Sequence, residues 1–211
     1  MLVGHFAAGM VAKKIRPEIS LGTLVLAAML ADLLWLVFMA AGIEHITVQP
    51  GRGIDAMASA HIPYSHSLLM TAIWGAALAL FMRRAWIVFA AAVSHWVLDW
   101  LAHPPRDLLL APGLAHYYGL GLWTSIPAAI AVEGGFWLFA IVLYLRATKS
   151  QSRAGTWGFW IVAVLLTLLW LANLASGPTA PNPVAESISL VVFGLFVAWA
   201  YWMDRARLPL P

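Results

Sequence analysis

The chain has 211 residues, of which 63% are hydrophobic and only 10% are charged. A soluble domain is nearer half apolar and a quarter charged, so most of this surface is expected to face lipid. The formal net charge of +3 does not require a nucleic-acid partner, because basic residues of membrane proteins usually mark cytoplasmic loops. Cysteine is absent, which excludes disulfides and thiolate metal sites and leaves His, Asp, Glu or backbone atoms as possible metal ligands.

Six apolar stretches approach the ~20 residues that a helix needs to cross a bilayer. They fall at 19–42, 63–82, 85–103, 122–145, 157–175 and 185–203. The segment 2–12 is too short to span, and we expect a half-helix or interfacial helix buried against the bundle. The sequence therefore predicts an all-α integral membrane protein, a single domain over residues 1–211 with about six transmembrane helices.

Basic residues alternate between the predicted spans in a way that indicates orientation. Ten of the twelve fall on one side, namely Lys13, Lys14, Arg16, Arg83, Arg84, Arg146, Lys149, Arg153, Arg205 and Arg207. Only Arg52 and Arg106 lie opposite. The positive-inside rule then predicts that both termini are cytoplasmic and that the loops 43–62, 104–121 and 176–184 face outward. Many of the twelve tryptophans lie near predicted helix ends and are interpreted as interface anchors without chemistry.

Five ionisable residues lie inside the predicted spans at a similar depth: Asp32, His66, His95, Asp99 and Glu133. At a rise of ~1.5 Å per residue they lie ~16–26 Å from the cytoplasmic end of a core ~30 Å thick. No lysine or arginine at this depth neutralises the acids, which are costly there unless they are protonated or bound to cations. A divalent metal ion would satisfy this layer most simply.

The strongest local pattern is His95 followed by Asp99, because residues four apart lie on one helix face and can bind one ion together. His103 extends this stripe to the outer end of the span. The alternative interpretation is a buried His–Asp hydrogen bond that only fastens helices together.

Two more histidines can approach the layer from outside the spans. His5 would reach its lower edge if the segment 2–12 is helical, and His116 could approach from the outer loop. Ser65 precedes His66, but neighbouring residues on a helix point ~100° apart, so we expect no serine–histidine contact of the nucleophile and base kind.

With these residues assembled, the chain resembles the bacterial inner-membrane family described as membrane-bound metal-dependent hydrolases. The resemblance covers about the first 135 residues and rests on the stretches 64–69 and 94–101, on the early His5 and on Asp32 in the first span. That family is distantly similar to the zinc-dependent phospholipase C and P1 nuclease group, all-helical enzymes with up to three zinc ions. The soluble enzymes also use a free amino-terminal residue as a ligand.

The resemblance implies a main site of Asp32, His66, His95 and Asp99, with Asp99 bridging to an ion near His5. His103, His116 and an acid would hold another ion, and Glu133 is the acid that the depth estimate offers. One to three zinc ions are thus implied, although another divalent metal would also suit these ligands.

The predicted function is that of a metal-dependent hydrolase in the bacterial inner membrane, with Asp32, His66, His95 and Asp99 as catalytic residues. Metal held by His and carboxylate with one open position makes water nucleophilic, and a paired site suits a phosphoester. A site in the outer half of the membrane points to a lipid or lipid-linked substrate. The alternatives are a transporter or channel for divalent cations or protons, and a structural membrane protein with buried polar fasteners.

Overall fold

The computed structural model describes residues 1–48, 57–82, 85–177 and 182–210. Most of them are helical, and the described strands form three short antiparallel pairs, β1 with β2, β3 with β4 and β5 with β6. The elements in chain order are α1 (Leu2–Ile15), α2 (Leu21–Ala28), α3 (Leu30–Ala40), β1 (His45–Val48), β2 (Met57–His61), α4 (Pro63–His66), α5 (Leu68–Phe81), α6 (Ala85–Ala102), β3 (Leu108–Leu109), β4 (Tyr117–Tyr118), the 3-10 turn η2 (Leu122–Thr124), α7 (Ile126–Ala129), the π-helical turn η3 (Ile130–Gly134), α8 (Gly135–Ala147), β5 (Thr148–Ser150), α9 (Arg153–Ser176), α10 (Pro183–Ala206) and β6 (Arg207–Pro209).

Three continuous helical segments are long and apolar enough to cross a membrane: Ile126–Ala147, Arg153–Ser176 and Val184–Ala206. Helices α2 and α3 pass the same test only as a pair, because the chain bends by 54° between them. Helices α5 and α6 are apolar but shorter. The described part of the chain is therefore an all-α protein with three helices that could span a membrane, or four if the bent pair counts as one span.

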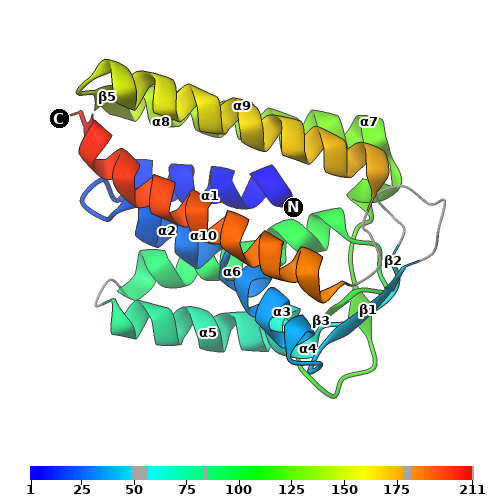
Figure 1. The fold of residues 1–211 in the computed structure, drawn as a ribbon. Coiled ribbons are helices and arrows are strands. Elements are labelled where there is room, and N and C mark those ends of the chain that lie inside the picture. Colours follow the sequence, from blue (N-terminus) through cyan, green and yellow to red (C-terminus); the bar gives the residue numbers. More distant parts are fainter. Residues whose placement is uncertain (49–56, 83–84, 178–181, 211) are drawn as a thin grey trace.

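Helix α1 lies in the middle of the bundle, between α8 and α9 on one side and α2 and α6 on the other (Figure 1). Its residues Val3, Phe6, Ala7 and Met10 are fully buried in the main apolar core. The expected half-helix buried against the bundle is thus a 14-residue helix whose amino-terminal end lies inside the molecule.

Two of the expected continuous spans are interrupted. The stretch 19–42 breaks at Met29, and the stretch 63–82 breaks at Ser67, whose backbone is extended. The Ser67 hydroxyl donates a hydrogen bond to the Pro63 carbonyl at 2.6 Å and caps the amino-terminal end of α5 through the Met70 amide. Serine side chains that bond nearby backbone groups favour helix ends over helix interiors. Hydrophobicity alone does not show these breaks.

The two ends of the bundle differ in character. Strands β5 and β6 and the carboxyl terminus lie at one end, whereas the β1–β2 hairpin, β3 and α7 lie at the other (Figure 1). Of the ten basic residues that the sequence places together, those described lie at the end of α1, the end of α8, in β5, at the start of α9, at the end of α10 and in β6. Arg52, Arg83 and Arg84 fall outside the described residues.

Candidate metal centre

Four of the predicted ligands meet in the interior, and three different segments supply them. Asp32 comes from the first turn of α3, His66 ends α4, and His95 and Asp99 lie one turn apart on α6. The His66 Nε2 atom lies 3.4 Å from Asp32 Oδ1 and 3.8 Å from Asp99 Oδ2. The His95 Nε2 atom lies 3.7 Å and 3.1 Å from the same two oxygens. The predicted convergence of these side chains is therefore present.

The break in the α2–α3 span orients His95. Its Nδ1 atom lies 2.8 Å from the carbonyl oxygen of Ala28, the last residue of α2. A carbonyl can only accept, so Nδ1 carries the proton and donates it. The bend at Met29 leaves this carbonyl available, and Nε2 of His95 is directed toward Asp32 and Asp99.

A second chain of hydrogen bonds orients His66. Its Nδ1 atom lies 2.7 Å from Ser65 Oγ, and the Ser65 hydroxyl lies 2.6 Å from Glu44 Oε2. The hydroxyl donates to the carboxylate, so it accepts from Nδ1, and Nε2 of His66 is directed toward Asp32 and Asp99. The expectation that Ser65 and His66 make no contact is therefore wrong. Helix α4 is a single turn that ends at His66, so the ideal helical angle does not separate the two side chains.

These two orientations direct the Nε2 atoms of both histidines toward the same pair of carboxylates. The Nε2 atoms of His66 and His95 lie 3.4 Å apart, beside two carboxylate oxygens. Two carboxylates in a buried cluster favour positive charge between them, which a divalent ion or protonated imidazoles can supply. Ligand atoms placed tetrahedrally around zinc are about 3.3–3.6 Å apart, close to the separations of 3.1–3.8 Å found here. The donor set and its dimensions therefore fit one divalent ion.

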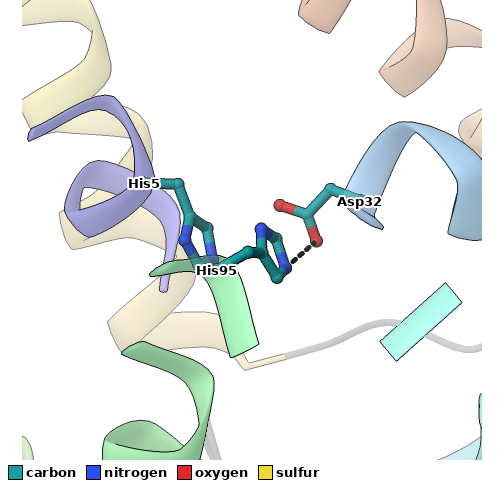
Figure 2. Close-up of side chains that lie close together, drawn as sticks. All are labelled: His5, Asp32 and His95. Carbon is teal, nitrogen blue, oxygen red and sulfur yellow. Dashed lines mark ion pairs between the residues drawn. The ribbon is translucent and has the colours of Figure 1, made fainter. Parts of the chain in front are cut away.

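A second cluster adjoins the first through Asp99. Its other oxygen, Oδ1, lies 2.5 Å from the Met1 amine and 3.2 Å from His5 Nε2. The His5 ring stacks on that of His95 with centroids 3.7 Å apart. Figure 2 shows His5 and His95 side by side, with Asp32 directed toward His95 from α3. Asp99 thus joins the two clusters, one through each oxygen.

Among the described residues, two sets of three have one ligand atom each within 4.8 Å of the others: His66 with His95 and Asp99, and His5 with Asp32 and His95. Asp99, His95 and His5 are almost completely buried, while the Asp32 side chain remains 21% exposed. Asp32 is therefore the ligand nearest to open space.

A cavity of about 260 Å³ adjoins the centre on the side of Asp32. Its polar lining comes from Asp32, His66, Asp99, His103 and Asn173. The rest of its wall is largely apolar and includes Leu2, Trp35, Ile46, Ile62, Trp123 and Phe193. Trp35 lines the cavity, and its indole nitrogen is buried without a hydrogen-bond partner in the described part of the chain.

Glu133 is fully buried but does not join the two sets of ligand atoms. It accepts hydrogen bonds from the Gly4 amide at 3.3 Å and the Trp123 indole at 3.4 Å, which holds it beside the amino-terminal end of α1. The π-helical turn η3 carries it inward. Its assignment as a ligand remains a prediction.

His103 and His116 are not brought together. His103 is buried and bonded to Asp107, whereas His116 is exposed and its ring lies against Tyr118. The described residues therefore do not assemble the third ion site that the resemblance implied from these two histidines.

Sequence reasoning missed four residues that support the site: Glu44, Ser65, Asp107 and Trp35. Glu44 and Asp107 lie in segments interpreted as outer loops, where an acid needs no special explanation. No tryptophan was singled out by the sequence, and Trp35 lies inside an apolar span where its ring needs no special explanation. A serine directly before a histidine was the one available signal.

Comparison with known proteins adds no constraint, since no family model, curated protein or solved structure matches this chain.

Proposed function

We propose that this chain is a membrane-embedded, metal-dependent hydrolase. The observation that carries the proposal is the convergence of two Nε2 atoms, those of His66 and His95, on the carboxylates of Asp32 and Asp99. Each ring is held through its Nδ1 atom, which leaves Nε2 directed at the same place as the two carboxylates. The resemblance to membrane-bound metal-dependent hydrolases supports the same function.

Zinc suits this donor set best, because two imidazoles and two carboxylates form a compact site without thiolates. The hydrogen bonds of the ligand histidines also follow the pattern of metal sites, in which the second ring nitrogen donates to a carbonyl or another fixed group. Asp99 Oδ1 and His5 Nε2 would serve a second ion. A third ion on His103, His116 or Glu133 has no such support.

When bound, the ion would supply water made nucleophilic near neutral pH and would polarise the bond that is cleaved. The protein contributes the arrangement around it. Asp32 Oδ1 faces the two histidines, so its other oxygen is left to accept a proton from an attacking water.

The substrate we propose is a phosphoester of a lipid or lipid-linked molecule. The cavity joins a polar floor at the centre to largely apolar walls, which suits a molecule with a charged group and a hydrocarbon chain. We further propose the topology that the charges predict, with about six spans, both termini cytoplasmic and the centre in the outer half of a bacterial inner membrane.

The first experiment measures bound metal in the purified protein and in two variants, His95→Ala and Asp99→Ala. We expect about one zinc or more per chain in the natural protein and a loss in both variants, with His116→Ala as the matched control that keeps its metal. Metal-free natural protein, after purification in zinc-containing buffer, would refute the metal centre.

The second experiment tests the reaction. The zinc-loaded protein is mixed with phospholipid vesicles, and release of phosphate or of the phosphorylated headgroup is followed with and without a chelator. Hydrolysis that a chelator abolishes supports the proposal. Zinc without hydrolysis, combined with zinc uptake into proteoliposomes, would instead establish the transporter that the sequence left open.

A further inference from the structure

His103 forms a buried pair with Asp107 at the edge of the cavity. The ring Nδ1 atom lies 3.0 Å from Asp107 Oδ2, and both side chains are almost completely buried. The Trp123 ring lies against the imidazole with centroids 4.8 Å apart. A carboxylate that accepts from Nδ1 sets the tautomer and the orientation of the ring, as in catalytic dyads of other enzymes. The Nε2 atom is then the ring nitrogen left for a molecule in the cavity.

The end of α6 and the turn that follows it bring His103 and Asp107 together. His103 follows the last residue of α6, and its amide still bonds the Asp99 carbonyl at 2.8 Å. Pro104 then ends the helix, and a turn closed by the Arg106 amide on the Pro104 carbonyl returns Asp107 to His103. The His103 carbonyl accepts from the Gly121 amide at 2.8 Å, which holds this turn against the following loop.

The pair lies beside the metal centre without belonging to it. His103 lines the same cavity as Asp32, His66 and Asp99, but it is absent from both sets of ligand atoms found among the described residues. Its Nδ1 atom is occupied by Asp107, and Arg106 Nε lies 4.0 Å from the other oxygen of that acid. An oriented imidazole that lines the cavity next to the ligands is suited to contact the substrate.

We propose that His103 is a catalytic residue that protonates the leaving group of the hydrolysed phosphoester, with Asp107 as its positioning residue. This inference rests on the proposed function. In the step, the water oxygen forms a bond to phosphorus and the bond from phosphorus to the ester oxygen breaks. His103 acts as an imidazolium whose Nδ1–H is held by Asp107 and whose Nε2 proton passes to the departing oxygen. The attacking water gives its proton to Asp32, and a proton then returns to His103 Nε2, so the net reaction consumes one water.

The test uses two substrates that share a hexadecyl phosphate group and differ in the leaving group. One is an ester of an alkyl alcohol, a poor leaving group that needs a proton, and the other is an ester of 4-nitrophenol, which leaves without one. Loss of a general acid typically costs about 100-fold or more, so in His103→Gln we expect such a loss on the alkyl ester and less than about tenfold on the nitrophenyl ester.

Three companion measurements separate this role from others. Zinc content and thermal unfolding of His103→Gln should match those of the natural protein, and Asp107→Asn should show the same leaving-group pattern at smaller magnitude. If His103→Gln does not fold, Asp107→Asn carries the test. His116→Gln, an exposed histidine in the outer loop, is the control and should leave both rates unchanged.

The outcomes are distinct. Equal losses on both substrates would make the pair structural and overturn the inference, and loss of zinc from His103→Gln would make His103 a ligand and also overturn it. In both cases the hydrolase would stand. Failure of the zinc-loaded natural protein to hydrolyse either ester or phospholipid would overturn the proposed function and this inference with it.

Discussion

His95 Nδ1 donates a hydrogen bond of 2.8 Å to the carbonyl of Ala28, a residue 67 positions earlier in the chain. In an unbroken helix that carbonyl would accept from the amide of residue 32. The bend between α2 and α3 releases it and at the same time places Asp32 in the first turn of α3. One backbone interruption therefore positions one ligand and orients another.

Ser65→Ala should weaken metal binding although Ser65 is not a ligand. The variant removes the acceptor of His66 Nδ1 and separates that histidine from Glu44, and loss of such supporting bonds typically costs about 10–100-fold in metal affinity. Competition with a zinc chelator measures the change. Ser94→Ala is the matched control, because Ser94 precedes His95 but bonds the Ala91 carbonyl of its own helix, and its affinity should stay within about threefold. Equal effects of both changes would contradict the proposed orientation of His66.

Zinc should raise the thermal stability of the natural protein. A ligand at about 100 times its Kd stabilises the folded state by about 2.7 kcal/mol. Thermal unfolding in detergent, with zinc and with a chelator, measures this difference. Asp99→Ala should show little or no zinc-dependent shift, since Asp99 contacts both clusters. A shift of the same size in this variant would place the zinc elsewhere.

Gly22→Ala should destabilise the packing of α2 against α10. A Cβ atom at Gly22 would collide with the ring of Tyr201, whose hydroxyl lies 3.1 Å from Thr23 Oγ1. Overpacking of this kind costs about 1–3 kcal/mol. Gly194→Ala, on α10, has open space around the added carbon and should cause no loss. Thermal unfolding of both variants tests the contact, and equal stability of the two would exclude it.

Asp204→Ala should destabilise the protein at the basic end of the bundle. Asp204 accepts from Lys13 Nζ at 2.8 Å, from Ser20 Oγ at 2.7 Å and from the Leu21 amide at 3.0 Å, and Lys13 is buried. Removing the partner of a buried donor typically costs about 1–3 kcal/mol, and we expect a loss in this range because Asp204 is partly exposed and Lys13 keeps its bond to the Ile19 carbonyl. The exposed Lys14 provides the control.

A double mutant tests whether the stability lost in Asp204→Ala comes from its pairing with Lys13. Combining Lys13→Met with Asp204→Ala should cost less than the sum of the single changes, since no buried charge is left uncompensated. Strict additivity in thermal unfolding would mean that the two side chains do not act as a pair.

Much of the site was predictable because burying its ionisable side chains in apolar segments costs free energy unless they have partners. Acids and histidines within apolar segments demand partners, and counting residues from the basic ends placed Asp32, His66, His95 and Asp99 at one depth, where the structure brings them together. The argument does not extend to His116, because a loop residue can remain exposed at no such cost. The structure leaves His116 at the surface.

The sequence by itself determined the all-α apolar character of the chain and the layer at which its ionisable residues meet, because hydrophobicity and helical rise are properties of local segments. Only the tertiary structure decided the breaks at Met29 and Ser67, the bond from His95 to Ala28, and the links from His66 through Ser65 to Glu44. These depend on which carbonyl, hydroxyl or carboxylate lies opposite each imidazole. That choice is made by packing between segments far apart in the chain, and no local pattern contains it.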